Sequence, residues 1–228
     1  MSLSLDCRHC GNVYVVRCIG RIVTGEESSV LEAAIKRGLL DTNRMVVNVA
    51  EVSRVDSTGI GLLVRFVSHI RNRGGDLRLA SPQPFLSNLL QLTKLTTIMR
   101  VCDTEEAAIV SFLKEPTVKI SDAKTAGPLV LFLDESPDLC AFVRSLLNGH
   151  GYEVLSTCRL HDARLLLKAA DVDYLVLGPD NSKLPDDTVV ASLKSLAPKA
   201  TTVLLDSGFK VSNPENAGFE LLQKMRPV

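Results

Sequence analysis

The sequence has no excess of either charge and no long hydrophobic run. Its 228 residues include 26 Lys and Arg and 26 Asp and Glu, so no basic surplus points to nucleic acid or to an anionic membrane. No stretch reaches the roughly 18 apolar residues of a membrane-spanning helix, and the first residues lack the basic and apolar regions of a signal peptide. We therefore expect a cytoplasmic protein that binds neither nucleic acid nor membrane.

The sequence also lacks a complete set of metal-binding or catalytic residues. Cys7 and Cys10 have the spacing of zinc ligands and enclose His9, but no second matched pair accompanies them. We interpret them as part of an N-terminal turn, with a metal or redox role as the alternative. The remaining cysteines stand singly in apolar stretches, where a free thiol behaves as a small hydrophobe: Cys18, Cys102, Cys140 and Cys158. Because no nucleophile pattern surrounds the four histidines, we expect neither an enzyme nor a cofactor.

Apolar periodicity divides the first half of the chain into alternating strands and helices. Strands are predicted at 13–19, 45–50, 77–80 and 98–101. Amphipathic helices are predicted at 24–40, between Phe85 and Leu92, and at 104–114, the last behind a cap at Asp103 or Thr104. This order predicts a mixed sheet with helices packed against it.

A hydroxyl-bearing turn stands where one predicted strand passes into a helix. Val55 is followed by Asp-Ser-Thr-Gly-Ile-Gly, and apolar residues then recur at helical spacing up to Ile70. Asp56 or Ser57 is therefore a natural N-cap, with Thr58 in the first turn. Because a helix start carries unpaired amide donors and the positive end of the helix dipole, it would tolerate a phosphate on Ser57. Taken alone, the cluster is more typical of simple capping than of a modification site.

Residues 13–113 resemble a STAS domain, the module of bacterial anti-sigma factor antagonists and of sulphate-transporter tails. Four pieces carry the resemblance in order: the opening strand and turn at 13–21, the strand before Asp56, the turn at 56–61, and the segment 73–80 with Pro84 and a helix behind it. The resemblance implies that a partner kinase phosphorylates Ser57, with Thr58 as the alternative. It also implies a partner-binding surface made of Asp56, Ser57, Thr58, Gly59, Ile60 and Gly61.

The same resemblance implies a function in partner switching. The dephosphorylated surface would capture an anti-sigma factor that is also a serine kinase of the histidine-kinase-like ATPase type, which frees the sigma factor. Phosphorylation of Ser57 would end the capture, and the chain would supply an acceptor without catalytic machinery. Two alternatives stay open. One is a non-enzymatic scaffold built from STAS domains, and the other is a phosphorelay receiver fused to a STAS effector.

The second half of the chain has its own alternating pattern. We predict a domain at 1–115, a linker at 116–128 that contains Pro116 and Pro128, and a second domain at 129–228. Strands near 129–133, 152–156, 174–177 and 201–205 alternate with helices, and the last helix is predicted near 214–225. This is the signature of a doubly wound, flavodoxin-like parallel sheet. The segment resembles a response-regulator receiver, with a truncated form as an alternative.

The resemblance to a receiver is poor in its chemistry. Asp134 and Glu135 match the acidic magnesium-binding pair and are weak metal candidates, because they suit simple turn and cap residues better. The aspartate that should end the third strand is Gly178, unless an insertion brings Asp180 into its place. The next strand ends in Asp206 where the family has threonine or serine. We therefore expect no aspartyl phosphorylation, and a role in dimerisation or partner docking instead.

Overall fold

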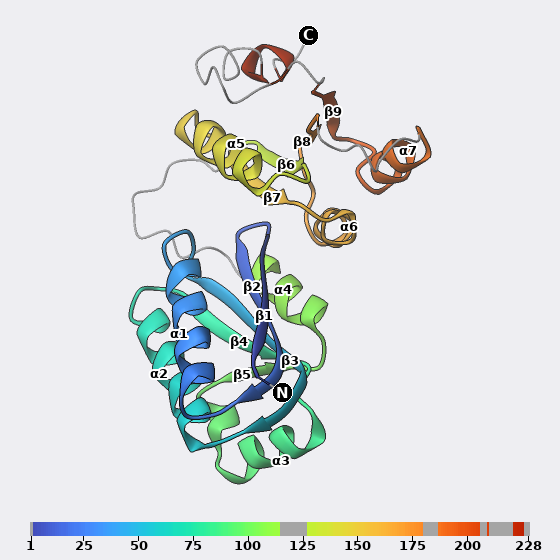
Figure 1. The fold of residues 1–228 in the computed structure, drawn as a ribbon. Helices are drawn as coiled ribbons and strands as arrows, with labels where there is room; N and C mark the ends of the chain where they lie inside the picture. Colours follow the sequence, from blue (N-terminus) through green and yellow to red (C-terminus); the bar gives the residue numbers. More distant parts are fainter. Residues whose placement is uncertain (1, 115–126, 180–186, 206–208, 210–220, 226–228) are drawn as a thin grey trace. The chain divides into compact units, whose positions relative to one another are not determined.

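The computed structural model describes residues 2–114, 127–179, 187–205, 209 and 221–225, and Figure 1 shows their arrangement. The chain divides into two compact units, with the main boundary between residues 121 and 122. Most of the predicted linker at 116–128 lies outside the described residues. The domain limits 1–115 and 129–228 therefore stay predictions, and we describe each unit by itself.

The first unit contains a mixed sheet in the order β5-β4-β3-β2-β1. Its strands are β1 (Ser4–Cys10), β2 (Val13–Ile22), β3 (Arg44–Val55), β4 (Asp76–Ala80) and β5 (Arg100–Cys102). The strands from β2 to β5 are parallel to their neighbours. Only two residues join β1 to β2, which requires an antiparallel hairpin, and Gly11 takes the positive φ of 62° that such a turn needs. The mixed sheet predicted from the sequence is confirmed.

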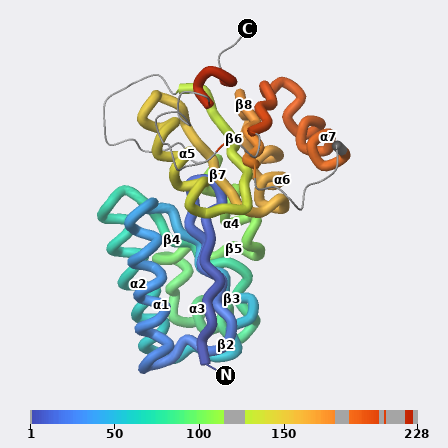
Figure 2. The backbone as a smooth tube through the Cα atoms, turned by 45° about the horizontal axis from the view of Figure 1, so that its top comes forward, coloured from blue at the N-terminus to red at the C-terminus, as the bar shows by residue number. Residues whose placement is uncertain are grey.

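Helices cover both faces of this sheet. They are α1 (Glu26–Gly38), α2 (Ser57–Arg71), α3 (Pro84–Leu92), the short 3₁₀ turn η1 (Leu95–Thr97) and α4 (Glu105–Lys114). Helices α1 and α2 lie side by side in both views (Figures 1 and 2). A register row of Val16, Val47 and Leu79 points toward them, because alternate strand residues share a face. These residues form one buried core with the inner sides of α1, α2 and α3.

The opposite face of the sheet packs against α4 and carries a buried arginine. Arg78 of β4 is fully buried, with its guanidinium carbon 3.5 Å from the centre of the Phe112 ring. Its Nη1 also donates to the Ser111 hydroxyl. Nearby, Arg8 of β1 forms an ion pair with Glu105 at 2.6 Å. These contacts join α4 to β1 and β4, and periodicity alone could not have predicted them.

The N-terminal interpretation requires a correction. Cys7 and Cys10 lie in strand β1 and not in a turn. The segment is short and polar, and its strand conformation depends on pairing with β2, which is not a local property of its sequence. Cys7 is exposed whereas Cys10 is buried, as expected for strand residues three positions apart, which point to opposite faces. The strand geometry therefore does not present the two thiols as a chelating pair.

Two further boundaries differ from the predictions. Strand β3 continues to Val55, beyond the predicted end at residue 50, so it leads directly into the turn at Asp56. The strand predicted at 98–101 begins later, at Arg100, because η1 and its flanking residues precede it. At α4, the Thr104 hydroxyl accepts a hydrogen bond from the Ala107 amide at 3.0 Å, so Thr104 is the cap.

The second unit contains a parallel sheet in the order β7-β6-β8-β9. Its elements are β6 (Leu129–Leu133), α5 (Pro137–Gly149), β7 (Glu153–Thr157), α6 (Leu160–Ala169), β8 (Tyr174–Leu177), α7 (Asp187–Leu196) and β9 (Thr201–Leu204). Val130 and Phe132 pack with α5 and with Leu221 on one face. Alternate residues such as Leu131 point to the other face, where α6 contacts β6. The likeness to a receiver domain stays a prediction, and of the helix predicted near 214–225 only 221–225 are described.

Candidate functional site at the start of helix α2

Asp56 caps the helix that begins at Ser57. It has an extended backbone, and its Oδ1 accepts a hydrogen bond from the Gly59 amide at 2.9 Å. Its Oδ2 accepts another from the Thr24 amide at 2.8 Å. These hydrogen bonds, from Gly59 first and then from Thr24, hold the pKa of the Asp56 carboxyl below its ordinary value. Of the two caps that the sequence left open, Asp56 is the one that the structure shows.

The two hydroxyls of the turn have different surroundings. Thr24 Oγ1 lies 3.0 Å from Asp56 Oδ2 and 2.6 Å from Thr58 Oγ1. An ionised carboxylate can only accept, and one hydroxyl has one proton to donate. Thr24 therefore donates to Asp56, and the Thr58 hydroxyl donates in turn to Thr24. Thr58 is thus held within this hydrogen-bonded group.

Ser57 lies beside this group without joining it. Its side chain is exposed, and within the described part of the chain no group forms a hydrogen bond with its hydroxyl. The hydroxyl is free to rotate and to meet another molecule. Thr24 forms a hydrogen bond with Thr58 and none with Ser57, and so makes the two hydroxyls different. It was not among the site residues predicted from the sequence. Its position in the turn just beyond β2 was the only local signal.

The two glycines of the motif serve different purposes. A Cβ at Gly59 would lie 2.5 Å from the carbonyl oxygen of Ile22 and 2.8 Å from its Cγ2, so only glycine allows this close approach to the end of β2. At Gly61 a Cβ would meet nothing within 4 Å, and the residue is exposed. Ile60 between them is partly buried. Of the residues predicted to bind a partner, Ser57, Thr58 and Gly61 face solvent, whereas Gly59 supports the turn.

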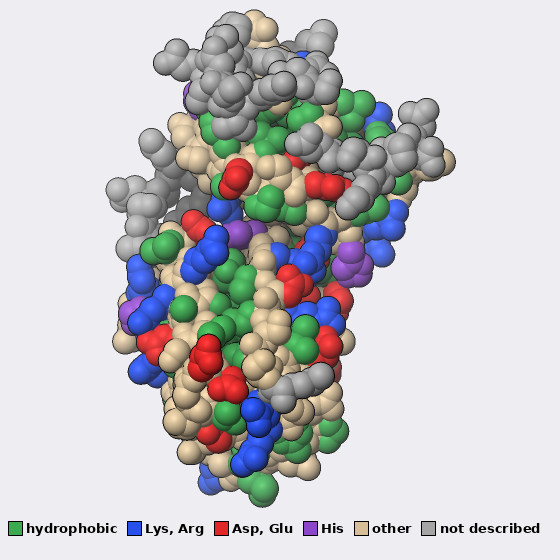
Figure 3. Space-filling view, in the orientation of Figure 1, with side chains coloured by type: hydrophobic (Ala, Val, Ile, Leu, Met, Phe, Trp, Pro, Cys, Tyr) green, Lys and Arg blue, Asp and Glu red, His purple; other side chains and the backbone are tan. Residues whose placement is uncertain are grey.

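A shallow hollow of about 250 Å³ lies next to the turn, between α1 and α2. Ser28 and Glu32 of α1 form one side of it, and Thr58, Gly61, Leu62 and Arg65 of α2 form the other. Arg65 and Glu32 form an ion pair at 2.8 Å between the two sides. Acidic and basic side chains are interspersed on the face of the first unit that Figure 3 shows, which agrees with the balanced composition. Such a surface suits a protein partner better than a polyanion.

The predicted acidic pair of the second unit is divided between the core and the surface. Asp134 follows β6, is fully buried, and accepts a hydrogen bond from the Ser136 amide at 2.7 Å. Glu135 is exposed. A Cβ at Gly178 would lie 2.7 Å from the Asp134 Cβ, so the Asp134 side chain occupies the space that a residue at 178 would need. Asp180 and Asp206 lie outside the described residues.

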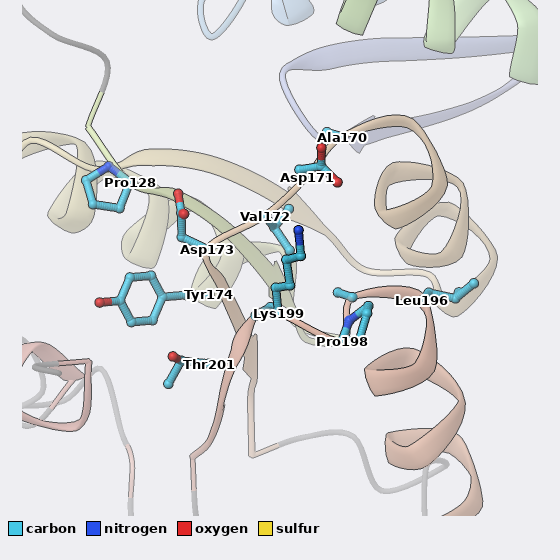
Figure 4. Close-up of a pocket in the computed structure, with 12 residues that line it drawn as sticks. Pro128, Ala170, Asp171, Val172, Asp173, Tyr174, Leu196, Pro198, Lys199 and Thr201 are labelled. Atoms are coloured by element: carbon cyan, nitrogen blue, oxygen red, sulfur yellow. The ribbon is translucent and has the colours of Figure 1, made fainter. Parts of the chain in front are cut away.

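A second hollow in this unit, of about 540 Å³, lies near the amino ends of β8 and β9 (Figure 4). Its charged side chains are Asp171, Asp173 and Lys199, and Asp173 accepts a hydrogen bond from the Leu129 amide at 2.7 Å. Parallel sheets hold their ligands at the carboxyl ends of the strands, which is the opposite edge. Among the described residues, no group of three or more His, Cys, Asp and Glu side chains could hold a metal ion. We assign no site to this hollow.

Comparison with known proteins supports a STAS domain in the first unit. Residues 4–108 match the model of the STAS domain family. A Thermotoga maritima protein, described as a candidate anti-sigma factor antagonist, is 30% identical over 67 residues, which are 29% of this chain and 59% of that protein. The chain therefore spans only 59% of this curated relative. In the part of the chain that the structure describes, no helix is both long enough and apolar enough to cross a membrane.

Solved structures are also similar to part of the chain. The crystal structure of a candidate anti-sigma factor antagonist from Thermotoga maritima is 20% identical and covers 47% of this chain and 92% of that one, with a TM-score of 0.44. The phosphorylated form of the Bacillus cell fate determinant SpoIIAA is 22% identical and covers 49% and 99%, with a TM-score of 0.40. A protein from Mycobacterium paratuberculosis, described as an anti-sigma factor antagonist, is 20% identical and covers 48% and 93%, with a TM-score of 0.43.

Proposed function

We propose that this protein is an anti-sigma factor antagonist that is controlled by phosphorylation of Ser57. Its partner is an anti-sigma factor that is also a serine kinase of the histidine-kinase-like ATPase type. The surface around residues 56–61 binds this partner in the cytoplasm while Ser57 carries no phosphate. The chain provides the acceptor, and the partner provides the catalysis. The homology of residues 4–108 to STAS domains supports the general function.

The availability of the Ser57 hydroxyl is the observation that carries the proposal. Asp56 is committed to the Gly59 and Thr24 amides, and Thr58 is committed to Thr24. Ser57 is exposed at the first position of α2. The Ser57 hydroxyl is therefore the one of the two that a kinase can modify without breaking a hydrogen bond within the protein. This favours Ser57 over Thr58 as the acceptor.

The position of Ser57 also explains how one phosphate could act as a switch. A phosphate at the start of α2 would face the positive end of the helix dipole, so the fold itself would tolerate it. In a packed protein interface the same group adds about two negative charges. These charges must be desolvated and would repel an acidic partner surface, so the complex would dissociate while the free protein stays folded.

We propose that the second unit is a degenerate, receiver-like domain that contributes a docking or dimerisation surface. The close packing of Asp134 against Gly178 supports this proposal, because it leaves no room for a phosphoacceptor at residue 178. The same packing weighs against the alternative of a working phosphorelay receiver. No particular contact among the described residues supports the scaffold alternative.

Phosphosite mapping with a serine-kinase anti-sigma factor tests the proposal. We expect acid-stable phosphate on Ser57 in the wild-type protein and in Thr58→Ala, and none in Ser57→Ala. Thr58→Ala is a matched control, because it removes the neighbouring hydroxyl and leaves Ser57 in place. Phosphate found on Thr58 alone, or retained by Ser57→Ala, would contradict the assignment. Acid-labile phosphate on an aspartate would favour the receiver alternative instead.

A further inference from the structure

Two cysteines that stand far apart in the sequence meet in the second unit. Cys140 lies in the first turns of α5, and Cys158 directly follows β7. Their sulfur atoms are 3.6 Å apart. Cys140 is buried, whereas Cys158 is partly exposed. The sequence predicted both as isolated small hydrophobes, so the structure gives them a relationship that their spacing does not indicate.

The surroundings hold the two sulfurs at the carboxyl edge of the sheet. The Cys140 Sγ lies 3.4 Å from the carbonyl oxygen of Asp134 and 3.6 Å from that of Thr157, which are the residues that follow β6 and end β7. The sulfurs of a disulfide are about 2.05 Å apart. Disulfide formation would therefore require side-chain rotations that shorten the distance between the two sulfurs from 3.6 Å to about 2.05 Å.

We propose that Cys140 and Cys158 form a peroxide-sensitive pair that is oxidised to an intramolecular disulfide. This modification site is independent of the function proposed for Ser57. Cys158 is the attacking residue, because a peroxide can reach it from solvent. Cys140 is the resolving residue, because it is buried directly beside it.

The chemistry needs one equivalent of a hydroperoxide. The Cys158 thiolate attacks the O–O bond, so an S–O bond forms, the O–O bond breaks, and the alcohol or water that leaves takes a proton. The Cys140 sulfur then attacks the sulfenic acid of Cys158. The S–S bond forms, the S–O bond breaks, and the departing water takes the Cys140 proton. Two thiols are oxidised and one peroxide is reduced.

The surroundings of the two thiols favour a first attack by Cys158 and a second attack by Cys140. Hydrogen bonding with the Cys140 thiol lowers the pKa of Cys158, and Arg159 acts in the same direction, although burial, Asp134 and Asp162 oppose them. The hydrogen bond to Cys158, together with burial, raises the pKa of Cys140, so Cys158 is the more acidic of the two thiols. Cys18 differs from Cys158 in this respect, because burial raises the pKa of Cys18 to about 12.

Peptide mapping of the full-length protein tests the proposal. The reduced protein is treated with hydrogen peroxide, its free thiols are blocked with iodoacetamide, and it is digested with trypsin without a reductant. Cleavage after Lys124, Arg144 and Arg159 releases Cys140 in peptide 125–144 and Cys158 in peptide 145–159. We expect these two peptides to appear joined, lighter than their sum by two hydrogen atoms, and to separate on reduction.

Three variants make the test specific. Cys158→Ser should abolish the joined peptides. Cys102→Ser, which alters another partly exposed cysteine, should keep them. In Cys140→Ser the sulfenic acid on Cys158 should persist and react with dimedone; if this variant fails to fold, Cys158→Ser still decides the matter, because its substitution is near the surface. Wild-type Cys158 that stays reduced, or that proceeds to sulfinic acid without joining Cys140, would overturn the proposal.

Discussion

At the scale of single residues, Ser57 and its neighbours differ in what they are free to do. Thr24 gathers Asp56 and Thr58 into one hydrogen-bonded group, whereas the exposed Ser57 hydroxyl stays outside it. This difference leads to one prediction about binding and one about pH.

Replacing Ser57 by aspartate should weaken binding to the anti-sigma factor, whereas Ser57→Ala should leave it nearly intact. A charge buried in the interface costs several kcal/mol, whereas loss of one hydroxyl costs about 1 kcal/mol. Titration calorimetry measures both. Ser68→Asp is the charge-matched control, since Ser68 is also exposed on α2 but lies near the opposite end of the helix. Equal affinities of Ser57→Asp and Ser57→Ala would show that this turn is not the binding surface.

Asp56 should titrate below the ordinary aspartate value of 3.8. Because the folded state lowers this pKa, the ionised carboxylate stabilises the fold at pH values above 3.8, and this stabilisation is lost as the pH falls through the folded pKa. A pH titration of the side-chain carboxyl carbon by NMR measures it, with Asp56→Asn to assign the signal. Thr24→Val should raise the pKa part of the way, because it removes one hydrogen bond and keeps the Thr24 amide. A pKa at or above 3.8 in the wild-type protein would contradict the cap.

At the scale of elements, the start of α2 is positioned by its contact with the end of β2. The Asp56 amide donates to the Ile22 carbonyl at 3.2 Å, and Gly59 packs against the same residue. The turn is therefore held by a strand distant in sequence as well as by its own cap.

Substitution of the two glycines should have opposite effects on stability. Gly59→Ala should destabilise the first unit by about 1–3 kcal/mol, because its methyl group would overlap Ile22. Gly61→Ala is the matched control at an open helical position, and it should stabilise by up to about 1 kcal/mol. Chemical denaturation compares them. If Gly59→Ala were as stable as Gly61→Ala, the close approach of α2 to β2 would be wrong.

At the scale of the whole molecule, the two units differ in the chemistry they retain. The first presents a hydroxyl at a helix start. The second has a buried Asp134 where a receiver would need an open acidic site, and a glycine at 178 in place of an acceptor. We therefore propose covalent phosphate chemistry for the first unit alone.

Acetyl phosphate should leave the second unit unmodified, and beryllofluoride with magnesium should not bind to it. Gly178 offers no nucleophile, and its space is filled by the Asp134 side chain. Mass spectrometry and amide NMR spectra of the full chain provide the measurements, with a working receiver treated in parallel as the positive control. Phosphate on Asp180, or magnesium-dependent shifts around Asp134, would show instead that this unit is a functional receiver.

Local pattern was enough to predict most elements of the first unit. The sequence alone shows the amphipathic periods of α1 and α2 and the apolar runs of β3 and β4. Each of these patterns reflects which residues of its own element are buried. Strand β1 was missed because seven largely polar residues become a strand only by pairing with β2. The extension of β3 to Val55 was missed for a similar reason, since it pairs with Ile22 at the end of β2.

The sequence by itself determined the chemistry available at the turn: a carboxylate that can cap a helix, two adjacent hydroxyls, and glycines beside them. Only the tertiary structure decided which hydroxyl is free, because Thr24 reaches Asp56 and Thr58 from the turn that follows β2. It also brought Cys140 to Cys158 and placed Asp134 against Gly178. In each case the partners are far apart along the chain. Thr24 and Asp56, like Asp134 and Gly178, meet because parallel strands align their carboxyl ends at one edge of a sheet, and Cys140 reaches the same edge from the first turn of α5. Local periodicity carries no information about such contacts.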